Sequence, residues 1–292
     1  MDLPLPAAHT DAPELPGAPF VLAEPDQQTA PLVLASPHSG RSYGPEFVAA
    51  VRLDPLGLRR SEDSFVDELF ASAPALGVPL LAATFPRAFC DANREAWELD
   101  PAMFEEKLPD WVNTTSARVG AGLGTIARVV ASGEAIYRRK LRFAEAEARV
   151  RGCWQPFHRA LEGLIARTRL RFGACLLVDC HSMPAAVQLS RSAADVVLGD
   201  AHGTACAPRT IRLAEQVLEG LGYRVRRNDP YAGGFITRHY GRPRERVEAM
   251  QIELNRSLYM DEARIEKAPG FARVQRDMAT LVAALAAATR TA

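Results

Sequence analysis

LLVDCHSMP, residues 176–184, joins an apolar run to an acid and an imidazole. The apolar residues lead into Asp179, Cys180 and His181, and Pro184 then ends the run. A short apolar run with such an end is typical of a strand buried on both faces. Because ligands in open α/β sheets gather outside the carboxyl ends of the strands, we expect this strand to deliver an acid and an imidazole to a functional site.

Segments with strand and helix patterns alternate on both sides of this stretch. Apolar runs predict strands at residues 31–40, 78–85, 173–182, 194–200, 222–231 and 248–260, with a further strand or a turn at 87–94. Amphipathic patterns predict helices at 61–77, capped by Ser61, and at 138–171, 208–221 and 278–292. The alternation predicts one α/β domain over residues 31–292, with a mixed, mainly parallel sheet flanked by helices. The acidic, proline-rich residues 1–30 are expected to form a loosely ordered N-terminal arm.

The composition excludes several classes of function. The chain has 292 residues, of which 48% are hydrophobic and 24% charged, and its formal net charge is zero. A neutral chain has no global field that would attract nucleic acid or an anionic membrane, so we expect neither partner. No apolar window is long enough for a membrane span, and the N-terminus lacks the pattern of a signal peptide. The expected location is the cytoplasm, and a homo-oligomer stays possible.

The five cysteines are scattered along the chain without any CxxC spacing. This pattern indicates neither a disulfide framework nor a structural zinc site, so we interpret them as small buried hydrophobic residues. Cys180 adjoins His181, but neighbours on a strand point to opposite faces, which argues against a catalytic pair.

Two of the six histidines follow directly on predicted buried strands, namely His38 and His181. Two histidines at one sheet edge can hold Zn²⁺ with a carboxylate as the third ligand and an open position for water. Simple hydrogen bonding is the alternative for each of them. His9 lies in the predicted arm, His158 inside a helix suits packing, and His202 is a weaker candidate that would orient the site or cap a turn.

Six motifs in the same order resemble the N-formylglutamate amidohydrolase family, over about residues 31–262. They are SPHSG (36–40), EDSFVDELF (62–70), FPRAFCDANR (85–94), VDCHSMP (178–184), NDPYAGGFITRHYG (228–241) and MQIELNRSLYMDE (250–262). That family is similar in fold to the zinc carboxypeptidases and aspartoacylase. The resemblance implies metal-assisted hydrolysis of an N-acyl amino acid.

The resemblance makes His38 and His181 the imidazole ligands of one zinc ion per chain. A carboxypeptidase pattern would place a glutamate three residues after the first histidine, where this sequence has Arg41. Asp63 matches the recurring acid of the family and is the expected third ligand, with Glu62 as the alternative. An acid in the first turn of a helix, favoured by the helix dipole, is the competing interpretation of both.

Two further carboxylates have expected roles at this site. Glu253 lies in an otherwise apolar strand, where burial raises the pKa of a carboxylic acid toward the range of a general base. The resemblance makes it the base that acts on the attacking water, and a solvent-facing glutamate at a strand end is the alternative. Asp179 is expected to accept a hydrogen bond from the second ring nitrogen of a ligand histidine.

The FPRAFCDANR motif supplies two arginines and an asparagine. A guanidinium group matches a carboxylate with two parallel hydrogen bonds. The resemblance assigns Asn93 and Arg94 to the substrate α-carboxylate and Arg87 to the scissile carbonyl. A salt bridge from either arginine to Asp91 or Glu95 is the alternative.

The segment YAGGFITRHYG, residues 231–241, has two glycines that permit close approach of the backbone to a ligand. Gly234 is therefore a candidate for substrate binding, and Arg238 or His239 is expected to contact a side-chain carboxylate of the substrate. A hairpin turn is the alternative.

The glycine-rich segment VGAGLGTIARVV, residues 119–130, raises the alternative of an NAD-dependent oxidoreductase. No convincing strand precedes it and no βαβ unit surrounds it, so a loop that lines the pocket is favoured. The leading hypothesis is zinc-dependent hydrolysis of N-formyl-L-glutamate to formate and L-glutamate, in histidine degradation. A deacylase for another N-acyl amino acid and a non-catalytic metal- or ligand-binding relative are the alternatives.

Overall fold

A seven-stranded sheet forms the centre of the computed structural model, which describes residues 17–130, 132–185 and 194–290. The strand order is β1-β3-β2-β4-β7-β5-β6. The strands are β1 (Phe20–Ala23), β2 (Leu32–Ser36), β3 (Leu80–Ala83), β4 (Cys175–Met183), β5 (Val196–Gly199), β6 (Val225–Arg227) and β7 (Val247–Asn255). Neighbouring strands are parallel except for the pairs β1–β3 and β5–β7. The predicted mixed, mainly parallel sheet is confirmed.

The central strands β4 and β7 pair in register from Cys175↔Val247 to Met183↔Asn255. Their side chains alternate between two buried clusters, one on each face of the sheet. Cys180 belongs to the cluster on the face away from His181, as the alternation predicts. All five cysteines are buried and free.

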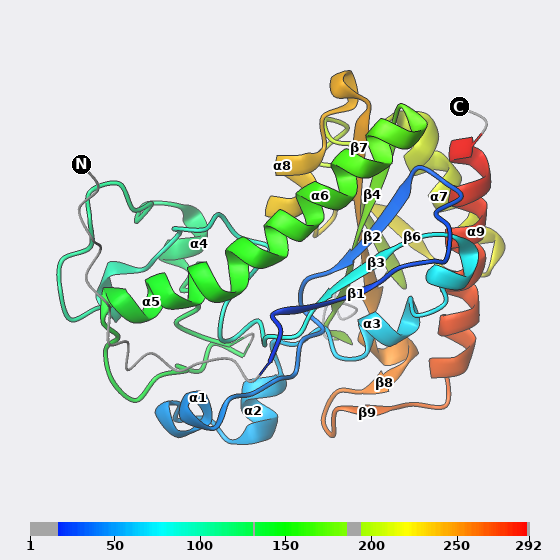
Figure 1. The fold of residues 1–292 in the computed structure, drawn as a ribbon. Coiled ribbons are helices and arrows are strands. Elements are labelled where there is room, and N and C mark those ends of the chain that lie inside the picture. The colour runs from blue at the N-terminus through cyan, green and yellow to red at the C-terminus, as the bar shows by residue number, and fades with distance from the viewer. Residues whose placement is uncertain (1–16, 131, 186–193, 291–292) are drawn as a thin grey trace, which may run out of the picture.

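Helices cover both faces of the sheet (Figure 1). One face packs against α6 (Gln155–Phe172) and α8 (Phe235–Tyr240), and the other against α3 (Val66–Leu69), α7 (Pro208–Gly220) and α9 (Phe271–Arg290). The helix predicted at 138–171 consists of α5 (Phe143–Arg149), a π-helical segment (Val150–Trp154) and α6. No helix in the described part of the chain is long and apolar enough to cross a membrane.

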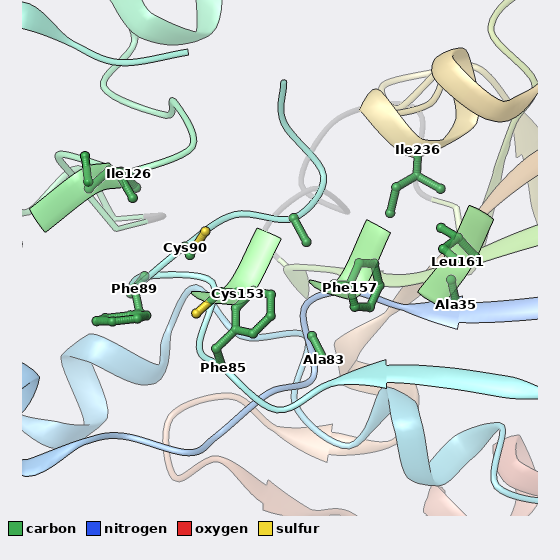
Figure 2. Packing of buried hydrophobic residues seen from close by; sticks show 14 of the residues in the cluster. Ala35, Ala83, Phe85, Phe89, Cys90, Ile126, Cys153, Phe157, Leu161 and Ile236 are labelled. Atoms are coloured by element: carbon green, nitrogen blue, oxygen red, sulfur yellow. The ribbon is translucent and has the colours of Figure 1, made fainter. Parts of the chain in front are cut away.

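The cluster under α6 supports the end of the sheet that carries the polar residues. Phe157 and Leu161 of α6 are buried with Ala35 of β2, Phe85 and Ile236 of α8 (Figure 2). Phe85 and Phe157 meet edge to face with ring centroids 6.4 Å apart. Truncating one such buried side chain typically costs about 2–5 kcal/mol of stability, so this packing holds the loops after β2 and β3 firmly.

The chain between β3 and α5 contains little regular structure and lies at one end of the sheet (Figure 1). It includes α4 (Ala117–Gly120). Two short helices, α1 (Pro45–Ala50) and α2 (Pro55–Arg59), follow β2, and a small hairpin of β8 (Met260–Asp261) and β9 (Glu266–Lys267) follows β7.

The structure corrects two expectations about elements and decides between the alternatives for residues 87–94. The arm expected over residues 1–30 contains β1, which pairs antiparallel with β3 at the sheet edge, and residues 1–16, with His9, lie outside the described residues. The helix expected at 61–77 begins only at Val66, because Phe65 adopts a left-handed backbone conformation with φ 68°. Residues 87–94 form turns, the second of the two expected alternatives.

Candidate active site

Three loops and two strands bring polar side chains to the carboxyl ends of β2, β4 and β7. His181 lies near the end of β4 and Glu253 near the end of β7, on the same face of the sheet. His38 follows β2, and its carbonyl oxygen accepts a hydrogen bond of 3.0 Å from the backbone N–H of Asp63. A side chain at Gly40 would collide with the backbone of Phe85, so glycine is required there.

His38, Asp63 and His181 form a buried cluster whose candidate ligand atoms lie within 4.8 Å of one another. The Asp63 Oδ2 atom lies 3.3 Å from His38 Nδ1 and 2.9 Å from His181 Nδ1. His38 Nδ1 is buried and makes no hydrogen bond within the described residues. Two imidazole nitrogens and a carboxylate oxygen that converge in this way fit a zinc ion.

The second ring nitrogen of each histidine contacts a buried carboxylate. His38 Nε2 lies 2.7 Å from Asp91 Oδ1, and His181 Nε2 lies 2.8 Å from Asp179 Oδ1. Histidines that bind a metal usually donate their other N–H to such a group, which fixes the ring and the tautomer. The structure therefore gives Asp179 the contact expected of it, and Asp91 is its counterpart on the other ring.

The structure decides which of Asp63 and Glu62 is the candidate third ligand. The Glu62 carboxylate accepts hydrogen bonds from Tyr43 (2.6 Å), Arg59 (3.0 Å) and Ser64 (2.8 Å), outside the histidine cluster. Asp63 directs Oδ2 at both histidines, so Asp63 is the carboxylate that the geometry offers as a ligand.

Two further contacts hold the Asp63 carboxylate. Its Oδ1 atom accepts hydrogen bonds from Arg256 (3.0 Å) and Ser182 (3.2 Å). Burial alone would raise the pKa of Asp63, but the adjacent His181 and His38 side chains hold it well below its usual value. Asp63 is thus a fixed, charged acceptor.

Glu253 is buried, in contrast to the alternative of a solvent-facing strand end. Burial raises its pKa to about 7, with Asp63 adding to this effect and His181 and Arg87 opposing it. Gln251 donates a hydrogen bond of 2.7 Å to Glu253 Oε1. A carboxylate with a pKa near neutrality can both accept and return a proton, as a general base requires.

Arg87 lies beside this group with part of its guanidinium exposed to the cavity. Its Nε donates to Asp91 Oδ2 at 2.9 Å. The contact to Asp91 is the salt bridge considered as the alternative, but it uses only Nε and leaves the terminal nitrogens for a ligand.

Asn93 and Arg94 line the cavity, and the side chain of each makes hydrogen bonds to other parts of the protein. The amide nitrogen of Asn93 lies 3.1 Å from Asp179 Oδ2 and 3.0 Å from His181 Nε2, and its oxygen accepts from the backbone N–H of Ile236 at 2.8 Å. Both the nitrogen and the oxygen of the Asn93 amide thus contact other parts of the protein, and the contact with the substrate α-carboxylate that the resemblance implies stays a prediction.

Arg94 donates from Nε to the carbonyl oxygen of Leu123 (2.9 Å) and from Nη1 to that of Asn93 (2.8 Å). Burial lowers its pKa to about 10, the charges of Arg87 and Arg118 act in the same direction, and Asp91 opposes them. These contacts indicate that Arg94 supports the walls of the site.

The segment around Gly234 forms the short helix α8 and not a hairpin. Gly233, Gly234 and Arg238 line the cavity, whereas His239 stacks on Phe235 with ring centroids 4.7 Å apart and does not line it. A side chain at Gly234 would collide with the Asn93 amide, so glycine is needed for this close approach.

A cavity of about 430 Å³ connects these residues. The glycine-rich segment lines one wall through Leu123, Ala127 and Val129, as the favoured interpretation of that segment predicts. Within the described residues no strand lies between β3 and β4, so the segment lacks the strand of a dinucleotide-binding unit. His202 lies outside the lining and occupies a turn with φ 56°.

The sequence interpretation missed several polar residues of the cavity, among them Gln251, Arg118 and Arg256. Gln251 lies two residues before Glu253 on the same face of β7, so the period of the strand could have revealed it. Arg118 and Arg256 also line the cavity, and nothing in their local sequence distinguishes them from surface arginines.

Two histidines, an aspartate and a buried glutamate lie around one cavity at the edge of an open α/β sheet. This arrangement is typical of the active site of a hydrolase. The family comparison is more specific. The model of the N-formylglutamate amidohydrolase family matches residues 30–260, and the chain belongs to this family. The resemblance seen in the six motifs is confirmed, and the oxidoreductase alternative is wrong.

Named relatives of this chain belong to the same family. N-formylglutamate deformylase of Pseudomonas aeruginosa is 31% identical over 238 residues, which cover 80% of this chain and 83% of the relative. The Pseudomonas putida protein of the same name is 30% identical over 244 residues, 81% of this chain and 84% of the relative. The crystal structure of an N-formylglutamate amidohydrolase from Ralstonia eutropha JMP134 is 40% identical with a TM-score of 0.89, over 94% of this chain and 99% of that one.

Proposed function

We propose that this chain hydrolyses N-formyl-L-glutamate to formate and L-glutamate. Two relatives that carry the name N-formylglutamate deformylase support the substrate. The observation that carries the proposal is that a buried glutamate and the cluster of His38, Asp63 and His181 face one cavity. We place the reaction in the cytoplasm, in amino-acid metabolism and histidine degradation.

His38, Asp63 and His181 would hold one Zn²⁺ ion. The two nitrogens and one oxygen are the donor types that zinc binds in catalytic sites. The buried His38 Nδ1, which makes no hydrogen bond within the described residues, supports this fit. When bound, zinc supplies a Lewis acid that activates water and polarises a carbonyl group.

Glu253 would move the protons of the reaction. Its Oε1 is fixed by Gln251, which leaves Oε2 to accept the proton of the attacking water. Glu253 then returns this proton to the nitrogen of glutamate as the bond to the formyl carbon breaks. A pKa near 7 lets one carboxyl group perform both transfers.

Arg87 would stabilise the negative charge that develops on the formyl oxygen. Its Nε is held by Asp91, so the position of the guanidinium is set before the substrate binds. Preorganised donors at a developing oxyanion are typically worth about 10²–10³ in rate.

Release of formate and glutamate by the purified protein tests the proposal. We expect equimolar products from N-formyl-L-glutamate, loss of turnover after treatment with a chelator, and recovery on addition of zinc. N-acetyl-L-glutamate is the control for the acyl group. Turnover of the acetyl compound alone would assign the chain to a different deacylation.

A further inference from the structure

Five arginines line the cavity, and three of them are either buried or bound to a buried carboxylate of the protein. Arg256 donates to Ser182, to backbone carbonyls and to Asp63, Arg94 donates to two carbonyl oxygens, and Arg87 is tied to Asp91. The two others, Arg118 and Arg238, are exposed and come from separate elements.

Arg118 belongs to α4, in the glycine-rich segment. Its side chain makes no hydrogen bond or ion pair within the described residues, although it lines a cavity that also contains buried acids. A guanidinium in that position has all of its donors available to a ligand.

Arg238 belongs to α8, on the segment that follows the paired glycines. Within the described residues its one hydrogen bond runs from Nη1 to the carbonyl oxygen of Gly233, at 2.9 Å. This contact directs the side chain back toward the cavity, and Nε and Nη2 stay free.

Asn93 and Arg94 hold the two elements that carry these arginines. Arg94 Nε donates to the carbonyl oxygen of Leu123, whose backbone N–H donates to the carbonyl oxygen of Arg118 at 2.8 Å. Asn93 Oδ1 accepts from the backbone N–H of Ile236, in the first turn of α8.

The charges of the cavity favour an anion with two acidic groups. Its carboxylates at Asp63, Asp91 and Glu253 are buried and already contact histidine, arginine or glutamine side chains. The guanidinium groups of Arg118 and Arg238 therefore have no counterion within the described part of the chain.

We propose that Arg118 and Arg238 each bind one carboxylate of the substrate, and that Asn93 and Arg94 position them. On this basis Arg118 and Arg238 restrict the enzyme to N-acyl derivatives of dicarboxylic amino acids. The inference rests on the proposed function for its substrate, but the binding of a dicarboxylate can be measured without turnover.

Calorimetric binding of glutarate, an inert five-carbon dicarboxylate, tests the inference directly, with the monocarboxylate butyrate for comparison. We expect the native protein to bind glutarate more tightly than butyrate. Arg118→Met and Arg238→Met should each weaken glutarate binding by about 10- to 100-fold, since hydrogen bonds between charged groups are lost. Arg242→Met is the matched control, because Arg242 is exposed and does not line the cavity.

Kinetics with the two monoamides of N-formylglutamate give the second measurement. Arg118→Met should lose the preference for the free acid over one monoamide, and Arg238→Met should lose it over the other. In both variants the change should appear in KM more than in kcat. Native glutarate affinity in both methionine variants, or loss of the same preference in both, would overturn the inference. If the native protein binds glutarate selectively but releases no formate, the proposed reaction is wrong and the two-arginine site stands.

Discussion

His181 of β4 and Glu253 of β7 are register partners on adjacent parallel strands. Their side chains lie on the same face of the sheet, beyond the part that α6 and α8 cover. The candidate ligand and the candidate base are therefore held by the two most extensively paired strands of the sheet. Backbone pairing fixes their separation more firmly than two loops could, which suits a site that must hold a water between them.

Removal of either histidine should abolish metal binding. We expect purified native protein to contain one zinc per chain, and His38→Ala and His181→Ala to contain none, because each loses a ligand. His239→Ala is the control, since His239 does not line the cavity. Metal analysis of the folded proteins gives the answer, and full zinc content in both alanine variants would rule out the site.

The carboxylate of Asp179, which contacts His181, should increase the affinity of the site for the metal. Asp179→Asn keeps the shape of the side chain but removes the charge 2.8 Å from His181 Nε2. Loss of such a partner typically weakens metal binding about 10- to 100-fold. Competition with a chromophoric chelator measures this change, and an unchanged affinity would show that Asp179 does not act on the metal.

Arg87→Met should lower kcat by about 10²–10³ with a small change in KM, because its donors meet charge that develops only in the transition state. Steady-state kinetics with N-formylglutamate measures both parameters. A rise in KM at constant kcat would instead make Arg87 a substrate-binding residue.

Gly234→Ala should impair the site, since the added methyl group would collide with the Asn93 amide. We expect a loss of about 1–3 kcal/mol in stability from the overpacking, together with reduced activity. Gly163→Ala in α6 is the matched control, because a side chain there meets nothing within 4 Å and alanine favours a helix. Equal stability of both variants in chemical denaturation would contradict the packing described here.

His158 should make stability depend on pH. Burial lowers the pKa of His158 to about 4 from 6.5, and its ring lies 2.7 Å from Tyr240 Oη and 2.8 Å from the carbonyl oxygen of Ala92. Between these values the unfolded chain binds a proton that the folded chain does not, so stability falls as pH decreases from 6.5 to 4. The shift corresponds to roughly 3 kcal/mol.

His158→Gln can keep both contacts without this titration. Its free energy of unfolding should therefore fall less than that of the native protein over the same pH range, when both are measured by denaturant titration. Identical pH dependence of the two proteins would mean that folding does not lower the pKa of the His158 ring.

The sequence predicts the central part of the fold because strand periodicity is local. The apolar run of β4 and the alternation of Met250, Ile252 and Leu254 in β7 predict two central strands. The register that makes His181 and Glu253 partners on one face comes from the structure. The convergence of His38 with His181 follows from the parallel strands before them. These are the features that short-range patterns and sheet topology determine.

The roles of Asn93 and Arg94 could not be read in this way. Asn93 accepts a hydrogen bond from Ile236 and Arg94 donates one to Leu123, and both partners are far away in the sequence. Only the folded chain reveals these contacts. The same holds for Phe65, whose left-handed backbone delays the helix after Asp63. Tertiary contacts decide both cases, and local propensity carries no signal of them.

Single-turnover and steady-state measurement of formate release by Glu253→Gln tests the central claim most directly. Glutamine keeps the size of the side chain but cannot accept the proton of water. We predict native zinc content, native affinity for glutarate and a kcat reduced by about 10²–10⁴, the usual contribution of a general base. A Glu253→Gln protein that releases formate at the native rate would contradict the account.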